Sequence, residues 1–490
     1  MHFARASLAL GLVAAGSFAA ERVEILRDTY GVPHIYARTA AAAAFGSGYA
    51  QAADRGEQLL ANLKSAERNS VSSGLSPRVR AIVEAYCAGV NAYFGEARVD
   101  SAMVEAFSRS AFGLIPESND ILIAPSRSSE KSVIAILAPY GEWSGAARLY
   151  AIEVETSDGF AFAGMGPVGI PFPLIGHSDA IAIAVRGEGL GGDRALDQAW
   201  AMVNAATLDD AKKAVAMGQL PAQKFLIGTA DGNIYDSGDG TTNPPEGILL
   251  TGEGAPQAVA MTRDLIAHAN SFSAESAASL AFATDVYKAD TWQLRIARSA
   301  PGSEFVRMLT GWSRKAEENS RPALAFYLFK MSLGEYTPAV EPPQRLTEER
   351  LRAALRKAQD RFETEFPINA TYGSVFRIMR EGERRSWPVG GGTVVEAGMA
   401  TPRAVAFERR GPVMIGHAGQ LGVQVVALSK PIKSVIVLPF GESDSPESPH
   451  FEDQARQLFS RSLTVTTWFG DRKNLEKRAK DRQQLSAPLN

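Results

Sequence analysis

Apolar residues change their spacing near residue 118. Before it, residues 39–54 and 76–93 carry apolar side chains at helical spacing, after a short strand-like run at 22–26. Beyond it the apolar runs become short and are separated by turn residues, which is typical of β-strands. We expect such strands at 121–124, 132–137, 150–156, 160–164 and 180–185.

The later part of the chain returns to a mixture of strands and helices. Turn residues at 156–159 and 230–233 indicate hairpins. Further strands are expected at 224–227, 234–235, 424–428 and 434–438, and helices at 208–217, 290–299, 324–333 and 347–366. The basic run 472–482, which is mixed with acids, predicts a solvated helical tail. Strands with helices at both ends predict an α+β fold with stacked sheets between helical layers.

The first twenty residues have the pattern of a secretory signal peptide. His2 and Arg5 precede an apolar stretch at 6–18, and small residues at 17–20 suit cleavage. A buried N-terminal helix is the alternative. The signal predicts a periplasmic or secreted protein. Because no other run approaches ~20 apolar residues, we expect no membrane attachment after the signal is removed.

Charge and cysteine content exclude some classes of partner and scaffold. The net charge is −3 with both signs interspersed, so nothing indicates binding to nucleic acid. The single cysteine, Cys87, lies in an apolar helical pattern and is expected to be a small core residue, since it has no partner for an intrachain disulfide.

Ser118 stands directly before a predicted strand and is followed by Asn119. If the chain is cut before Ser118, this residue carries both a hydroxyl and a free α-amine. An α-amine titrates near ~7.7–8.0, so its neutral form can serve as the general base for the hydroxyl. The alternative is a polar turn that enters a strand.

A series of short motifs precedes and follows Ser118, and together they span most of the chain. They are ILRDTYGVPHIYA at 25–37, GYAQAADR at 48–55, YCAGVNAY at 86–93, GIP at 169–171, IGHS at 175–178, YGSVFR at 372–377, SWP at 386–388 and SPESPHFEDQ at 445–454. Together they resemble the penicillin acylase family. That family belongs to the N-terminal-nucleophile hydrolases and includes the acyl-homoserine-lactone acylases.

The resemblance implies a fold, a maturation step and an activity. The fold would be a four-layer αββα sandwich with a helical N-terminal segment. Maturation would divide the chain into a signal peptide (1–20), a small helical segment (21–95), a spacer without clear pattern that is removed or cut (96–117) and a large catalytic segment (118–490). The two retained fragments would stay together as a heterodimer. The activity would be that of an exported amidohydrolase, resembling penicillin amidase, that cleaves the linear carboxamide of a small acylated amine.

The resemblance also assigns roles to individual residues. Ser118 would be the nucleophile and, through its α-amine, the base. The backbone N–H of Gly187 and the side-chain amide of Asn270 would hold the oxyanion, with Asn243 as the rival amide. Substrate-binding positions would be Tyr140, Gly141, Ile175, Val185 and Gly189. His177 and His450 lie inside family motifs, where they are expected to make structural hydrogen bonds.

Metal and cofactor expectations are modest. No organic cofactor is implied. Asp193 and Asp197 lie where some relatives bind a structural calcium ion, but calcium takes six or more oxygen ligands, and surface carboxylates are the alternative. Glu117 and Asp120 depart from the family pattern on the two sides of Ser118. These departures, with the short first segment, bear on self-cleavage and on substrate range.

Other functions are weaker fits to the sequence. An S-x-x-K match at 128–131 lacks the K-T-G partner of β-lactamases, and 176–180 fails the last position of G-x-S-x-G. From a different class, the chain could be a non-catalytic exported scaffold that does not mature and binds acylated ligands. The acyl group and the amine stay open among β-lactam side chains, acyl-homoserine lactones and acylated peptides.

Overall fold

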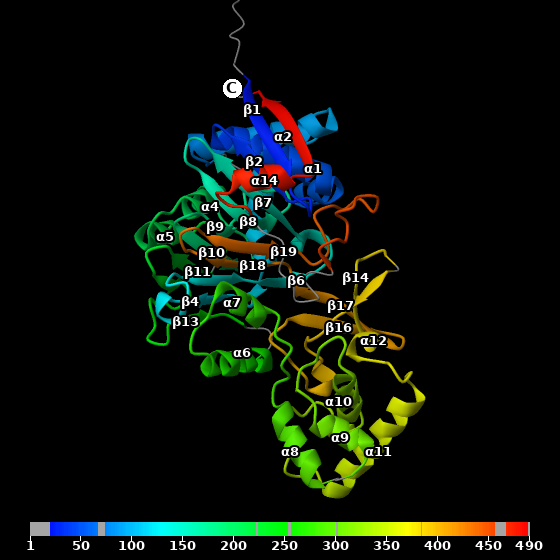
Figure 1. Ribbon diagram of the computed structural model, residues 1–490. Coiled ribbons are helices and arrows are strands. Elements are labelled where there is room, and N and C mark those ends of the chain that lie inside the picture. The colour runs from blue at the N-terminus through cyan, green and yellow to red at the C-terminus, as the bar shows by residue number, and fades with distance from the viewer. Residues whose placement is uncertain are drawn as a thin grey trace, which may run out of the picture.

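The computed structural model describes residues 20–66, 74–221, 224–252, 256–299, 302–383, 385–455 and 467–488. The predicted signal peptide therefore lies outside the described residues, apart from Ala20. Helices and strands are both abundant, and the strands form several sheets. This composition confirms the α+β class (Figure 1).

A nine-stranded sheet contains strands from both ends of the chain. Its order is β12-β11-β10-β9-β8-β7-β2-β1-β20, and its neighbours are antiparallel except for the parallel pair β2–β7. The strands are β1 (Glu21–Arg27), β2 (Pro33–Ala37), β7 (Leu149–Thr156), β8 (Ala161–Pro167), β9 (Ile175–His177), β10 (Ile181–Arg186), β11 (Lys224–Thr229), β12 (Ile234–Asp236) and β20 (Asp481–Ala487).

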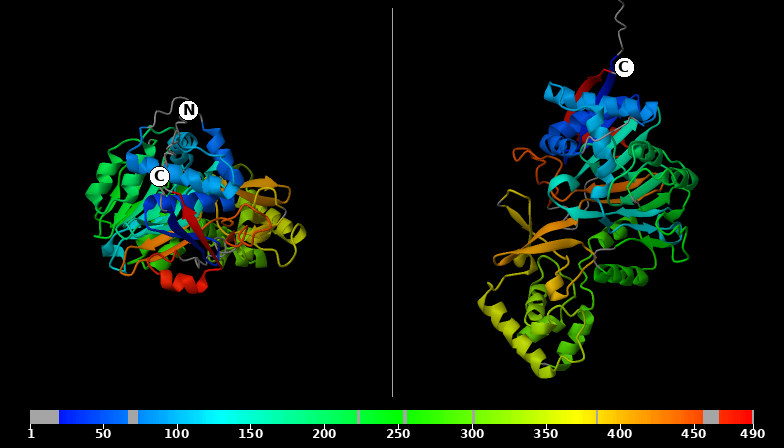
Figure 2. Two further views of the ribbon diagram at one scale, coloured as in Figure 1. Left: turned by 90° about the horizontal axis from the view of Figure 1, so that it is seen from above. Right: turned by 180° about the vertical axis from the view of Figure 1, so that it is seen from behind.

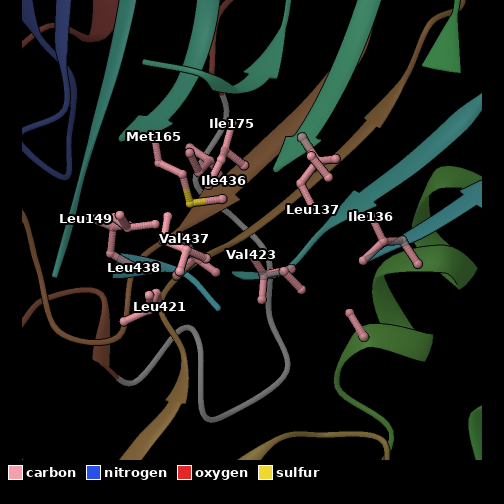
Figure 3. Close-up of a cluster of buried hydrophobic side chains, with 14 of the residues drawn as sticks. Ile136, Leu137, Leu149, Met165, Ile175, Leu421, Val423, Ile436, Val437 and Leu438 are labelled. Carbon is pink, nitrogen blue, oxygen red and sulfur yellow. The ribbon is translucent and has the colours of Figure 1, made fainter. Parts of the chain in front are cut away.

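A five-stranded antiparallel sheet faces it, in the order β13-β4-β5-β18-β19. These strands are β4 (Ile121–Ile123), β5 (Ile134–Leu137), β13 (Ile248–Leu250), β18 (Val423–Ala427) and β19 (Lys433–Val437). Met165 and Ile175 of the first sheet and Leu137, Val423 and Val437 of the second are buried together between them (Figure 3). This core is apolar because both sheets turn alternate side chains inward.

A six-stranded sheet continues the five-stranded one. Its order is β15-β14-β17-β6-β3, and β16 also pairs with β17. The strands are β3 (Glu117–Ser118), β6 (Pro139–Glu142), β14 (Phe376–Met379), β15 (Ser386–Pro388), β16 (Val405–Arg410) and β17 (Val413–Gln420). Only Ala138 separates β5 from β6, so the chain passes from one sheet to the other within one residue. This bend brings Ser118 of β3 beside Pro139.

Helices cover the outer faces of the two stacked sheets. Helices α1 (Ala40–Ser65), α2 (Pro77–Phe94) and α3 (Ser101–Ala111) pack together, with α1 against β1, β2 and β7, while α7 (Ala274–Ala281) lies on β5 and β18. The predicted four-layer αββα order is thus present. Glycines permit the closest approach between α1 and α2, because a Cβ on Gly89 would lie 1.9 Å from the carbonyl oxygen of Phe45.

The other helices flank the sheets or form a lobe below them in Figure 1. The flanking ones are α4 (Ala195–Val203), α5 (Leu208–Val215), α6 (Pro256–His268) and α14 (Arg472–Arg478). The lobe contains α8 (Ala289–Ser299), α9 (Glu304–Thr310), α10 (Arg321–Met331), α11 (Glu348–Thr364) and α12 (Tyr372–Val375). Figure 2 shows the lobe from behind, extending away from the stacked sheets on the side of β14 and β16. Short 3-10 helices are η1 (Phe112–Leu114), η2 (Pro125–Arg127), η3 (Gly145–Ala147), η4 (Gly334–Tyr336) and η5 (Val395–Ala397).

Two sequence predictions about local structure were wrong. The segment 96–117 is not irregular, because α3 fills half of it and buries Met103, Val104 and Phe107. The C-terminal run is a helix only as far as Arg478, after which β20 pairs along the whole of β1. Polar side chains hid this strand, since it lies at the sheet edge, where alternation with apolar residues is not required.

Two further expectations concern the core and the membrane. Cys87 is buried in α2, as predicted. Within the described part of the chain, every helix is too short or too polar to cross a bilayer.

Candidate active site

A cavity of about 210 Å³ lies beside Ser118. Its wall combines the start of the large segment with β6, α6, the η5 region and β16. The lining residues are Glu117, Ser118, Asn119, Tyr140, Ala258, Thr393, Val395, Glu396, Ala404, Val405, Ala406 and Phe407. At this volume the cavity is smaller than the range of about 300–1,000 Å³ that is usual for small-molecule sites.

Ser118 is held firmly at the wall of this cavity. The residue is only 1 % exposed, and its hydroxyl lies 2.9 Å from Thr251 Oγ1. Thr251 follows β13, whose pairing with β4 places Leu250 opposite Ile121. The same ladder therefore brings Thr251 level with the residues that precede β4, and its backbone N–H donates to the carbonyl of Asp120 at 3.0 Å.

Asp120 is a buried carboxyl group two residues after Ser118. One of its oxygens accepts the backbone N–H of Ala138 at 2.6 Å. Burial raises the pKa of Asp120 to about 6, although a hydrogen bond with the Ser118 hydroxyl, the Ala138 N–H and the charge of Arg186 act in the opposite direction. At neutral pH the group is mostly a carboxylate, yet it is far more basic than an exposed aspartate.

The N–H of Gly187 is occupied in the uncut chain. It donates to the carbonyl of Ile115 at 2.9 Å, and the two residues form an antiparallel bridge. Ile115 is fully buried. The donor that the resemblance assigns to the oxyanion is therefore available only after the segment before Ser118 moves away.

The five predicted substrate positions separate into two groups. Tyr140 lines the cavity, and burial followed by the charge of Glu117 raises its pKa to about 12, so its hydroxyl stays protonated. Gly141 neighbours it in β6 with Leu421 packed over it, while Ile175 and Val185 are buried in the core. Gly189 lies in the loop after β10. These four are not among the described residues that line the cavity.

The two candidate amides both lie away from Ser118. Asn270 is exposed after α6. It lies between Ala269, whose carbonyl accepts from Arg127, and Phe272, which bridges to Ser128 just after η2. Asn243 uses its amide within a turn, accepting the N–H of Ile234 and donating to Asn233. The structure brings neither amide to the cavity, so the side-chain oxyanion donor stays a prediction.

The carboxylates proposed for calcium already have cationic or hydroxyl partners. Arg109 contacts Asp193 at 3.4 Å. Asp197 accepts from the backbone and hydroxyl of Ser76 and from Arg194. Across the described ranges, no cluster of three or more His, Cys, Asp or Glu side chains is arranged to hold a metal ion.

Both motif histidines make local structural contacts. His177 is fully buried and lies 3.0 Å from the carbonyl of Ser178 through Nδ1, and burial lowers its pKa to about 4. His450 lies 2.7 Å from Asp453 through Nδ1 and packs against Gly31. Neither histidine lines the cavity beside Ser118 among the described residues.

The sequence pattern of penicillin amidase matches residues 22–67, 96–186 and 250–476, which is well over half of the chain. The chain belongs to the penicillin amidase family. Ser118, Thr251 and Asn270 lie in the matched segments, whereas Gly187 and Asn243 fall in the unmatched stretch between 186 and 250. Family membership supports a hydrolase of the acylase type.

Solved structures of other proteins also resemble this chain. One is the thermostable penicillin G acylase from Alcaligenes faecalis, with 12% identity, a TM-score of 0.49, and coverage of 74% of this chain and 98% of the acylase chain. A comparison with curated protein sequences finds no match.

Sequence reasoning missed several residues of the site. Thr251 is separated from Ser118 by more than a hundred residues, and it follows a three-residue apolar run that carries no functional signal. Glu396 lies in η5, Thr393 lies just before it, and Phe407 lies in β16. The spacing of apolar residues in the sequence indicated neither element. Asp120 was noticed only as a departure from the family pattern.

Proposed function

We propose that this penicillin amidase family member is an exported amidohydrolase that cuts its own chain before Ser118 and then hydrolyses a small acylated amine. The observation that carries the proposal is the position of the Glu117–Ser118 bond in the wall of a cavity of about 210 Å³. Export rests on the sequence pattern of residues 1–20, which lies outside the described residues apart from Ala20.

The chemistry follows from the free α-amine of the cut chain. Ser118 Oγ attacks the amide carbonyl of the substrate while its own α-amine takes the hydroxyl proton. The proton passes to the leaving amine, and an acyl-enzyme remains until water hydrolyses the ester. The N–H of Gly187, once Ile115 has left it, stabilises the negative oxygen in both steps.

The cavity favours an apolar acyl group. Val395, Val405 and Phe407 offer apolar surface, and Thr393 and Glu396 offer polar atoms on the same wall. We infer that the apolar residues contact the acyl chain and that the polar residues contact the amine. This division is common in pockets that place a few polar groups in an apolar lining.

The test is a comparison of Ser118→Ala with the wild type. We expect the wild type to yield a large fragment that begins Ser-Asn-Asp, seen by intact mass and N-terminal sequencing, and to hydrolyse at least one member of a panel of acylated amines. Ser118→Ala should lose both self-cleavage and amide hydrolysis, because it lacks the hydroxyl nucleophile and its chain therefore stays uncut. Ser126→Ala, which removes an exposed hydroxyl near η2, is the matched control and should retain both.

Two results would contradict the proposal. One is cleavage or amide hydrolysis that persists in Ser118→Ala. The other is a wild-type chain that stays uncut, which would favour the non-catalytic scaffold, with Ile115 permanently on Gly187.

A further inference from the structure

The first cut poses a problem that the mature enzyme does not have. Before cleavage, the nitrogen of Ser118 belongs to a peptide bond and has no basic lone pair. The α-amine that serves the mature site therefore cannot accept the hydroxyl proton when Ser118 attacks its own chain. Another group must take that proton.

The Ser118 hydroxyl contacts Thr251, and its hydrogen bond with Asp120 acts to lower the pKa of that carboxyl group. Thr251 Oγ1 lies 2.9 Å from Ser118 Oγ and 3.2 Å from the Ser118 carbonyl oxygen. It also accepts the backbone N–H of Asp120 at 2.8 Å. When Thr251 donates to Ser118 Oγ, the proton of Ser118 is left to point toward the carboxyl group of Asp120.

Asp120 has the surroundings of a proton acceptor. It is 2 % exposed, and Ala138 of the β5–β6 bend binds one of its oxygens. Arg186 of β10 is the charged group that acts on it, and Ser118 contributes a hydroxyl. A pKa of about 6 leaves the carboxylate ionised at neutral pH and basic enough to receive a proton.

Other titratable groups are less suited. Tyr140 lines the same cavity but is a protonated phenol, and His177 is directed to the carbonyl of Ser178. Glu396 is exposed in η5. Glu117 has its backbone in the bond to be cut, and the structure records no contact between its side chain and the Ser118 hydroxyl.

We propose that Asp120 accepts the hydroxyl proton of Ser118 during self-cleavage and that Thr251 is the positioning residue that orients this hydroxyl. The inference rests on the proposed function, because it assigns residues to the maturation step which that function requires.

The step balances without a cofactor. Ser118 Oγ forms a bond to the carbonyl carbon of Glu117, and its proton moves to Asp120. The bond between that carbon and the nitrogen of Ser118 then breaks, and the nitrogen takes the proton back from Asp120. An ester and a free α-amine result. Water hydrolyses the ester, giving a carboxylate at Glu117 and restoring the Ser118 hydroxyl.

The experiment follows the cleavage rate of purified uncut chain at several pH values by gel and intact mass. Asp120→Asn is the decisive variant, because its side-chain oxygen can still accept the N–H of Ala138 while the basic carboxylate is gone. We expect cleavage to slow by about 100-fold, the scale of a lost general base. The wild-type rate should rise with pH through about 6 and then level off, and Asp120→Asn should lack this rise.

Controls separate chemistry from folding. Asp179→Asn removes an exposed carboxylate and should cleave at the wild-type rate. Thr251→Ser keeps the hydroxyl and should cleave within about threefold of wild type, whereas Thr251→Val should be slower by at least about tenfold. Circular dichroism and thermal unfolding check that each variant folds. If Thr251→Val is unfolded, Thr251→Ser still tests the role of Thr251. The comparison of Asp120→Asn with Asp179→Asn still tests the role of Asp120.

The outcomes distinguish the two proposals. A wild type that cuts and hydrolyses amides, with Asp120→Asn cutting at the same rate and with the same pH profile, overturns this inference and leaves the proposed function intact. A folded Thr251→Val that cuts as fast as Thr251→Ser overturns the role of Thr251. A wild type that never cuts overturns both the inference and the proposed function.

Discussion

His34 shows what a buried charge contributes in this fold. Its side chain is fully buried in β2, with Nδ1 2.9 Å from Glu153 and Nε2 3.7 Å from Asp28. Burial alone would lower its pKa, but the two carboxylates outweigh burial and raise the pKa to about 9. The imidazolium is therefore part of the folded structure at neutral pH.

This residue predicts a defined pH dependence of stability. The ordinary pKa of histidine is about 6.5, so below pH ~6.5 both folded and unfolded chains carry the proton and the contribution is complete. As pH rises through about 9 the folded protein loses that proton and the contribution disappears. We expect the difference in free energy of unfolding between wild type and His34→Gln to shrink by on the order of 3 kcal/mol from pH 6 to pH 9.5.

Urea unfolding at the two pH values measures this difference. Taking the difference between the two proteins removes the contribution of the other titrating groups. A difference that is constant with pH, or that grows, would show that His34 is neutral in the folded protein.

At the same scale, the sequence singled out Ser118 as the predicted nucleophile but did not indicate which residues surround it. Ser118 could be found because a short motif and a chain of ordered matches lead to it. Ile175 and Val185 could not be placed by counting, since whether a strand residue faces the core or a cavity depends on the register of its sheet. Thr251 reaches Ser118 only through the β4–β13 ladder, and pairing between distant strands leaves no local pattern.

At the scale of elements, α3 is the feature that the sequence concealed. Its apolar residues, Met103, Val104, Phe107 and Ala111, lie on one helical face, and that face packs against α1, α2 and α4. Phe107 also approaches Gly169, where an added Cβ would lie 3.1 Å from its ring. The helix is short and follows a polar stretch, so its pattern is weaker than that of α11.

The packing of α3 predicts where the smaller fragment would end after the proposed cleavage. Removal of the whole segment 96–117 would expose the buried faces of α1 and α2, at about 25 cal/mol for each Å² of apolar surface. We therefore expect the smaller fragment to retain Ser101–Ala111 and to end between residues 112 and 117. Intact mass of the separated fragments measures this end, and a C-terminus before residue 101 would contradict the role given to α3.

Elements with a strong period were predicted well, and those shaped by their neighbours were not. α11 and the hairpin β7–β8 were found within a few residues of their ends. β20 reads DRQQLSA, and β3 is only two residues long; neither has a period that a sequence can display. Both form because a neighbouring strand, β1 or β6, has backbone N–H and C=O groups with which they can pair.

At the scale of the whole molecule, the first segment is enclosed by the second. β1 and β2 lie inside the nine-stranded sheet with β7 on one side and β20 on the other, and both flanking strands come from beyond Ser118. Arg55 of α1 adds contacts with the carbonyl oxygens of Gly441 and Glu442 and with the side chain of Asp444. A cut before Ser118 breaks none of these interactions.

This enclosure predicts that the two fragments stay together after the cut. We expect them to elute as one species in native size-exclusion chromatography and to separate only in denaturant. Deletion of residues 481–490 removes β20 and its ladder to β1, so the midpoint of urea unfolding should fall. Deletion of 489–490 alone is the control and should change nothing. Fragments that separate without denaturant would contradict the enclosure.

The pairing of β1 with β20, which sets Glu21 opposite Ala487, makes the backbone almost a closed ring. If the two ends were joined, the chain could be opened at a new point. The termini would then move while the tertiary contacts stayed the same. In a circularly permuted gene, the old ends would be joined by a short linker and translation would start with a methionine just ahead of Ser118. Removal of that methionine would then leave an amino-terminal serine. Such a protein would test the proposed amide hydrolysis independently of the proposed self-cleavage.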